Sequence, residues 1–428
     1  MPDHRARRFP RWVAGCAATV LLLASCSGDE GDATAPTTTA VPPTTEPRVD
    51  DGQFIIGLVT PTLGAGAEIG QSVRAAVLLA VDDVNESGGI AGQRIRVVRR
   101  DEGDDPATAQ RAVQDLVDAG ADAIIGPTSS VNLLGSLGTA VDGGVLTCSP
   151  TATALALDDF PDEGLLVRTS PSDALQARAL AQLVDESGSD RAVVVYLDDP
   201  YGRPFADDVR AALVAQGIVV TSTVGFTTST DRIGAAADSV AAIAPTMIVV
   251  IADGEAGSLV IDAVEARIGV PRPSYVVNDA MRLPGASGNA FSGSLAGRVQ
   301  GVSPIAYSDA TFFTDGLAEV DDSTSGVFAA NAFDCVNLIA LAGVATGSTQ
   351  PSAIGAAIPA VSTGGTTCAT FARCVEQIRE GRNINYDSPG AALDIGPDGD
   401  PTKALFQRFT FDLFGSDVAG RIMTVSSA

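Results

Sequence analysis

The feature that most constrains the fold is an alternation of short β-branched runs with longer helical stretches, which occurs once in each half of the chain. Strands are expected at residues 54–59, 94–100, 123–125 and 145–147, and again at 192–197, 218–224, 247–251 and 274–277. Helical periodicity fills the intervals, at 68–85, 106–118, 130–142, 202–216, 232–244 and 256–266. Strands joined through helices pair in parallel. The pattern predicts an α/β protein with two doubly wound, Rossmann-like lobes, since one ordinary core does not cover this length.

The N-terminus predicts export and lipid anchoring. Four Arg residues between positions 5 and 11 precede the apolar run 13–24, which is too short for the roughly 20 residues of a membrane-spanning helix. We therefore interpret residues 1–25 as a signal peptide. The sequence Leu23-Ala24-Ser25-Cys26 resembles the lipobox of bacterial lipoproteins, which implies lipidation of Cys26 as the mature N-terminus. The alternative is a soluble secreted protein cut nearby.

The segment after this cysteine is expected to be a disordered tether over residues 26–50, because Thr, Pro, Gly and acidic residues bury no apolar face. The formal net charge is −25, and loss of the signal peptide, with four Arg and one Asp, lowers it by a further three. Such an acidic protein repels nucleic acid and anionic lipid headgroups. Nucleic-acid binding is therefore excluded.

Four cysteines would remain in the oxidising compartment of the mature protein: Cys148, Cys335, Cys368 and Cys374. They allow three connectivities, of which the short spacing favours Cys368–Cys374, with Cys148–Cys335 following by elimination. A zinc site is the rival interpretation, but the sequence has no CxxC pair.

Several kinds of chemistry are excluded by composition. The only histidine, His4, lies in the signal peptide, so the mature protein has no imidazole for catalysis or metal binding. The only lysine, Lys403, is in no Gly-rich loop, and the glycines at 64, 66 and 70 are one residue too widely spaced for a dinucleotide fingerprint. An EF-hand loop counted from Asp394 would need Glu where Leu405 stands. We predict a non-enzymatic protein without cofactor or metal.

Two acidic or turn-rich segments are given structural interpretations. The four acidic residues between positions 101 and 105 are typical of a solvated loop. Near the end of the chain, residues 393–395 and 404–411 flank a Gly-Pro-Asp-Gly-Asp-Pro sequence at 396–401, which predicts a hairpin turn.

Five motifs together resemble the leucine/isoleucine/valine-binding proteins, the type I periplasmic solute-binding family. They stand at residues 85–92, 126–130, 149–153, 168–171 and 199–202, and the resemblance spans residues 53 to 415. It implies that a ligand lies between two lobes joined by a three-segment hinge. The expected division is residues 51–171 and 303–388 for the first lobe and 172–302 and 389–428 for the second, the last segment with a terminal hairpin.

The resemblance also implies the ligand-binding residues. In the first lobe, Ser130 would bind a carboxylate, Thr151 would offer a backbone carbonyl to an ammonium, and Thr153 would offer its hydroxyl and N–H to the α-carboxylate. In the second lobe, Tyr201 would close over the ligand and Asp279 would pair with the ammonium. Strand ends of open α/β sheets are where ligands bind, which agrees with these positions. Helix capping is the alternative for Ser130 and Asp279.

Two departures from the family pattern make branched aliphatic specificity doubtful: Ile69 replaces a covering aromatic residue, and Asp253 replaces a tyrosine. Asp253 either faces the ligand or is only a loop residue.

We expect a monomeric, extracytoplasmic, lipid-anchored protein that delivers an amino-acid-like ligand to an ABC permease in the membrane. The alternative is a sensor or receptor of the same fold without a role in transport.

Overall fold

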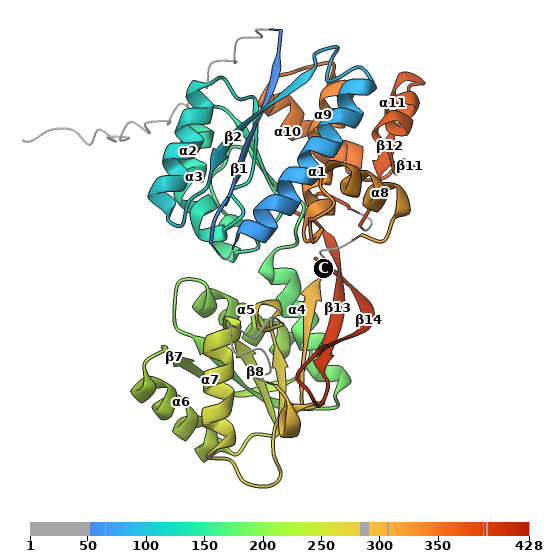
Figure 1. Ribbon diagram of the computed structural model, residues 1–428. Coiled ribbons are helices and arrows are strands. Elements are labelled where there is room, and N and C mark those ends of the chain that lie inside the picture. Colours follow the sequence, from blue (N-terminus) through green and yellow to red (C-terminus); the bar gives the residue numbers. More distant parts are fainter. Residues whose placement is uncertain are drawn as a thin grey trace, which may run out of the picture. The chain divides into compact units, whose positions relative to one another are not determined.

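The computed structural model describes residues 52–427 apart from 65, 283–290, 306–307, 388 and 391–392. The expected signal peptide, Cys26 and the tether therefore lie outside the described residues. Figure 1 shows the described chain as two α/β lobes, each with a sheet between layers of helices. The predicted fold class is confirmed.

The first lobe is built on a parallel sheet in the order β2-β1-β3-β4-β5 within the described residues. Its strands are β1 (Phe54–Thr60), β2 (Ile95–Asp101), β3 (Ala123–Ile125), β4 (Leu146–Ser149) and β5 (Leu166–Arg168). The main helices are α1 (Ala67–Glu86), α2 (Pro106–Asp118), α3 (Ser130–Asp142), α9 (Ala329–Thr346) and α10 (Pro351–Ser362). In Figure 1, α2 and α3 lie on one side of β1 and β2, and α1, α9 and α10 on the other.

The central strand β1 shows why both faces need helices. Its residues alternate in direction, so Phe54 and Ile56 join the core beneath α1 and α9, whereas Ile55 packs with Leu116 of α2. Every residue of β1 is buried. A strand buried on both faces has a continuous apolar sequence, which is why this run is recognisable from the sequence.

The first lobe is completed by a small parallel pair of strands and two further helices. These are α8 (Thr311–Val320), β11 (Thr366–Cys368), α11 (Phe371–Arg379) and β12 (Ile384–Tyr386). Among the described helices, α9 alone is long and apolar enough to meet the length and hydropathy criteria for a membrane span, and most of it is buried inside the protein. It packs against α1, α10 and α11 as a core helix.

The second lobe is built on a sheet in the order β14-β13-β10-β9-β8-β6-β7, as far as the chain is described. Its strands are β6 (Arg191–Leu197), β7 (Val219–Phe226), β8 (Met247–Ile251), β9 (Ser274–Val277), β10 (Val299–Pro304), β13 (Lys403–Phe411) and β14 (Asp417–Ser426). Its helices are α4 (Asp173–Glu186), α5 (Gly202–Ala215), α6 (Thr230–Ile243) and α7 (Gly254–Glu265). The strands from β7 to β10 are parallel, and β13 and β14 are added antiparallel.

The two faces of this sheet again have separate cores. Val194 and Val249 pack with residues of α4 and α5, whereas Val193 and Val250 pack with residues of α6 and α7. The carboxyl ends of β6, β8 and β9 lead directly to Tyr201, Asp253 and Asp279. The sheet therefore places three of the predicted ligand residues along one edge.

The turn predicted at residues 396–401 is present, but the flanking run 404–411 does not pair with residues 393–395. Across the turn, the Gly396 N–H donates to the Asp400 carbonyl at 2.7 Å, the Thr402 N–H donates to the Asp394 carbonyl at 2.8 Å, and an isolated antiparallel bridge joins Ile395 and Pro401. Ile395 is instead buried in the first lobe, and β13 forms its hairpin with β14.

The chain passes between the two sheets three times within the described ranges: after β5, after β10 and before β13. The fully buried Arg168 ties the first passage to the third. Its Nε donates to Asp400 Oδ1 at 2.6 Å, its Nη2 donates to Asp158 Oδ1 at 2.5 Å, and its backbone N–H donates to the Gly399 carbonyl at 2.9 Å. The pKa of Asp400 is raised by burial, although Arg168 opposes that shift.

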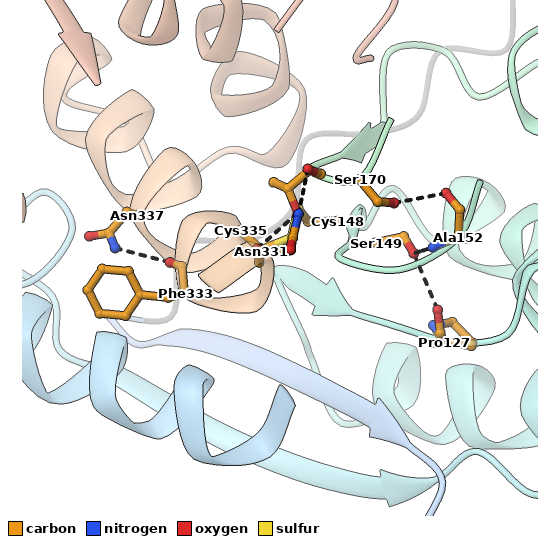
Figure 2. The surroundings of a disulfide bond; sticks show 10 residues. Pro127, Cys148, Ser149, Ala152, Ser170, Asn331, Phe333, Cys335 and Asn337 are labelled. Atoms are coloured by element: carbon orange, nitrogen blue, oxygen red, sulfur yellow. Dashed lines mark hydrogen bonds between the residues drawn. A yellow bond between two sulfur atoms is a disulfide. The ribbon is translucent and has the colours of Figure 1, made fainter. Parts of the chain in front are cut away.

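The cysteines lie in the pairs expected from the sequence. The sulfur atoms of Cys148 and Cys335 are 2.04 Å apart and those of Cys368 and Cys374 are 2.14 Å apart. Figure 2 shows that Cys148 and Cys335 join β4 to α9 next to Asn331. Asn331 Nδ2 donates to the Thr169 carbonyl at 2.8 Å. This pair therefore lies directly beside the first passage between the lobes.

Candidate ligand-binding site

The first-lobe part of the site lies on the loops that follow β3 and β4. Ser129 caps α3, since its Oγ accepts the Asn132 N–H, so Ser130 is the first residue of the helix and not its cap. Ser130 Oγ instead accepts the backbone N–H of Thr153 at 3.2 Å and that of Ala154 at 3.4 Å. Ser130 thus joins the two loops that carry the predicted ligand residues.

A buried carboxylate occupies the N-terminal end of α3. Glu102 is only 1 % exposed, and its two oxygens accept four hydrogen bonds of 2.7–3.0 Å from Thr128, Ser129 and Asn132. The interpretation of residue 102 as part of a solvated loop is therefore wrong. Its acidic neighbours at 101, 104 and 105 are exposed as expected. The sequence did not show this, because the donors come from a loop about 26 residues away.

Thr151 and Thr153 have different surroundings. The Thr151 hydroxyl donates to the Thr128 carbonyl at 2.7 Å, which braces the loop after β3. The Thr153 carbonyl accepts the backbone N–H of Asp173 at 2.9 Å, and the Thr153 side chain lies near the Asp173 carboxyl, where it acts to lower the pKa of that group. The loop after β4 is thereby attached to the beginning of α4.

In the second lobe, Tyr201 precedes α5 in a tight turn. Its backbone N–H donates to Asp199 Oδ1 at 3.0 Å, and Gly202 follows where an added Cβ would lie 2.2 Å from the Leu197 carbonyl oxygen. The ring packs against hydrophobic residues of both lobes and meets Phe205 edge-on, with centroids 5.8 Å apart. Burial and the charge of Asp173 raise the pKa of the Tyr201 hydroxyl well above its usual value, so it stays protonated.

Asp279 is the first residue of a short 3-10 turn, Asp279–Met281, directly after β9. The side chain of Gln176 and the N–H of Ala280 lie near its carboxyl and act to lower its pKa. Although partly accessible to solvent, it is surrounded by protein, and this desolvation raises its pKa. The contact with Gln176 on α4 shows that more than helix capping holds it.

A second acid, Asp173, connects the predicted residues. It is 2 % exposed and lies close enough to Asp279 for the two charges to repel, while the nearby hydroxyls of Thr153 and Tyr201 oppose the rise of its pKa. Desolvation, then the charge of Asp279, raises the pKa of Asp173 well above its usual value. Through Asp173 the structure brings Thr153 and Tyr201 together with Asp279.

Asp253 stands apart from this group. Its side chain is exposed and caps α7, with Oδ1 accepting the Ala256 N–H at 2.7 Å. Ile69 packs partly buried against the core of the first lobe. Asp173 and Gln176 were missed by sequence reasoning, because the Ser-Asp pair at 172–173 signals only a helix N-terminus.

Comparison with known proteins identifies the family. The family model described as periplasmic binding protein matches residues 54–361. The chain belongs to this family. Solved structures of the same fold include an ABC transporter substrate-binding protein from Desulfitobacterium hafniense and a leucine-binding protein from Thermotoga maritima.

Two relatives and one solved structure illustrate the range of this periplasmic binding protein's similarities. A chemotactic signal transduction system substrate-binding protein of Halobacterium salinarum is 27 % identical over 83 % of this chain and 86 % of its own length. A Leu/Ile/Val-binding protein of Rhizobium johnstonii is 32 % identical over 38 % of this chain and 44 % of its own length. The structure of a leucine-binding protein from Thermotoga maritima, 16 % identical, matches with a TM-score of 0.66 over 86 % of this chain and 98 % of its own. That likeness shows the fold.

Proposed function

We propose that this protein is the extracytoplasmic substrate-binding component of an ABC transporter and binds an amino acid or a related amide between its two lobes. The observation that carries the proposal is the meeting of Thr153 from the first lobe with Tyr201 and Asp279 from the second around Asp173. Hydroxyl groups and a carboxylate suit the two ends of an amino acid. A ligand that contacts both lobes favours the conformation in which both sets of contacts are made.

The proposed roles follow the family resemblance. Ser130 and Thr153 bind the α-carboxylate, the Thr151 carbonyl and Asp279 bind the ammonium, and Tyr201 covers the ligand. The exposed, helix-capping geometry of Asp253 supports a structural role for it. The proposed lobes are residues 51–171 with 303–388, and 172–302 with 389–428, except that residues 393–395 pack in the core of the first lobe.

Anchoring and oxidation complete the proposal. We infer that residues 1–25 direct export, that Cys26 carries the lipid anchor and that the monomer stays tethered to the outer face of the cell membrane through residues 26–50. Several acyl chains hold a protein at a membrane far more firmly than one. Outside the cytoplasm, Cys148–Cys335 and Cys368–Cys374 would be covalent disulfides.

The test is a thermal-shift screen of the chain from residue 27 onward with the standard amino acids, their amides and polyamines. A ligand at 100 times its dissociation constant adds about 2.7 kcal/mol to the unfolding free energy. At least one amino acid or amide is expected to raise the melting temperature. If none shifts it while another class of solute does, the amino-acid assignment is wrong.

A second function has an observation in its favour: the relative of Halobacterium salinarum that matches most of this chain belongs by name to a chemotactic signal transduction system. A sensor would present the ligand-bound form to a signalling protein and not to a permease. Deleting the gene separates the two. Loss of uptake of the identified ligand supports transport, whereas loss of taxis toward it with uptake intact supports sensing.

A further inference from the structure

The strand at one edge of the first-lobe sheet carries a concentration of positive charge. Residues 94–100 contain four Arg and no acidic residue, in a chain whose formal net charge is −25. Within the described sheet β2 is the outermost strand, with β1 on its inner side. Arg94, Arg96 and Arg99 are exposed to solvent. We call these three residues the basic edge.

The protein does not neutralise the charges of the basic edge. Among the described residues no carboxylate forms an ion pair with any of the three, whereas the adjacent Arg100 pairs with Asp115 at 3.2 Å. The acid that ends β2, Asp101, instead accepts hydrogen bonds from the Thr62 hydroxyl and from the Gly103 N–H. The basic edge is therefore an uncompensated positive surface on a strongly acidic protein.

Protection of the edge strand against pairing with other chains does not account for this composition. A single well-placed charge, a proline or a bulge serves that purpose. Acidic residues outnumber basic ones in this chain by 52 to 27. A run of four Arg without one acid therefore points to a partner of negative charge.

The basic edge lies where the chain enters the first lobe. Phe54, the first residue of β1, stands opposite Ile95 in the parallel ladder, and Ile55 stands opposite Arg96. The proposed tether, residues 26–50, ends just before this strand. A flexible coil of that length spans roughly 28 Å. Anchoring at Cys26 therefore keeps the basic edge close to the membrane surface.

We propose that the basic edge docks on anionic phospholipid headgroups of the membrane in which Cys26 is anchored. This inference rests on the proposed lipid anchoring and adds the orientation of the anchored body. Each Arg close to an anionic bilayer shifts the ratio of docked to undocked molecules by about fivefold. The acidic remainder of the surface is repelled by the same headgroups and turns away from them. A basic patch of this kind adds to the hold of the acyl chains.

Docking through the basic edge leaves the candidate ligand-binding site open. Arg94 and Arg96 stand at the amino end of β2, whereas the loops that carry Ser130 and Thr153 follow the carboxyl ends of β3 and β4. These strands are parallel, so the two groups lie toward opposite ends of the same sheet. The docked protein can therefore still capture its ligand.

The test attaches the protein to vesicles by a chemical bond that does not depend on natural lipidation. In the oxidised chain from residue 26 onward, the other cysteines are paired, and the thiol of Cys26 is coupled to a maleimide lipid. One set of vesicles is phosphatidylcholine alone, and the other also contains phosphatidylglycerol as the anionic lipid. Phenylglyoxal modifies accessible Arg side chains, and mass spectrometry gives the reaction rate of each.

The expected result is a slower reaction at the basic edge on anionic vesicles. In about 0.1 M salt, Arg99 should react at least about threefold more slowly on anionic than on neutral vesicles. Arg210, a half-exposed residue of α5 in the second lobe, should react equally on both. In about 1 M salt the difference at Arg99 should vanish, because charges are screened within about 3 Å.

Two double variants separate this edge from the net charge. Arg94→Gln with Arg96→Gln should abolish the slower reaction of Arg99 on anionic vesicles. Arg191→Gln with Arg232→Gln is the matched control and should leave it unchanged, since these arginines are also exposed and without an ion pair among the described residues, but lie in the second lobe. Equal rates at Arg99 on the two kinds of vesicle in the wild type, or the same slowing in both double variants, overturns the proposal.

Failure of the anchoring is read separately. If Cys26→Ser remains in the membrane fraction of cells, the lipid anchor is wrong, whatever the coupled vesicles show. An acidic protein as the partner of the basic edge would give equal rates at Arg99 on neutral and anionic vesicles, and this outcome also overturns docking on lipid.

Discussion

Replacing Glu102 by Gln tests the internal carboxylate at the N-terminal end of α3. In the wild type, Oε2 accepts the N–H and the hydroxyl of Thr128, and Oε1 accepts the Ser129 N–H and the Asn132 side-chain amide. Glutamine keeps one oxygen. Its NH₂ group must therefore face two former donors, whichever way the amide turns.

The better orientation points the NH₂ group at Thr128, because that hydroxyl can rotate and accept while the Thr128 N–H cannot. One hydrogen bond is then lost, and the remaining ones change from a charged to a neutral acceptor. Hydrogen bonds to charged groups contribute about 1.5–3 kcal/mol and neutral ones about 1 kcal/mol, and an unpaired buried donor costs a further 1–3 kcal/mol. We expect Glu102→Gln to lower the unfolding free energy by about 2–5 kcal/mol.

The assay is urea unfolding followed by far-ultraviolet circular dichroism, since the only tryptophan, Trp12, lies in the expected signal peptide. Asp104→Asn is the control: this neighbouring acid is exposed, and its substitution should change stability by less than about 0.5 kcal/mol. Equal unfolding midpoints for Glu102→Gln and Asp104→Asn would refute the assignment of Glu102 as a structural anchor of the loop.

Three other outcomes are expected. Asp279→Ala should weaken binding of the amino acid found in the screen by roughly 30-fold to several thousand-fold, because truncating one partner of a buried charge pair costs about 2–5 kcal/mol; calorimetry showing an unchanged dissociation constant would contradict the ammonium role. Cys26→Ser should appear in the soluble fraction with full ligand affinity, and retention in the membrane fraction counts against lipidation. The pKa of Asp173 is raised, so the folded protein binds this proton more tightly than the unfolded chain does. The contribution of this group to the unfolding free energy therefore increases as the pH falls from the pKa of the folded state toward that of the unfolded state, about 4. The melting temperature of the wild type minus that of Asp173→Asn should therefore rise between pH 7.5 and 4.5, and a flat difference contradicts the shift; Asp279, Tyr201 and Arg168 are the other groups facing this acid.

Local sequence patterns predicted the strands and helices well where burial is continuous. In the run at 54–59, both the odd-numbered and the even-numbered positions carry apolar residues, which is typical of a strand covered on both faces. The strand β1 occupies Phe54–Thr60. Asp105 followed by Pro106 signals a helix start, and α2 begins there, capped by Asp105. The turn at 396–401 was predicted, but nothing in residues 393–395 shows that Ile395 is buried in the first lobe while β13 pairs with β14 in the second.

The sequence by itself determined that the chain is an α/β protein of the periplasmic solute-binding family and that His4 is its only histidine. These conclusions depend on periodicity, composition and motifs, which are properties of contiguous segments. Only the tertiary structure decided which carboxylates are buried and which groups surround them. Glu102 was expected in a solvated loop and Asp173 was not singled out, yet each is buried among donors or charges that the fold brings from distant segments. Burial and charge neighbours set the protonation and hydrogen bonding of a carboxylate, and both arise only when the strands and helices are packed together.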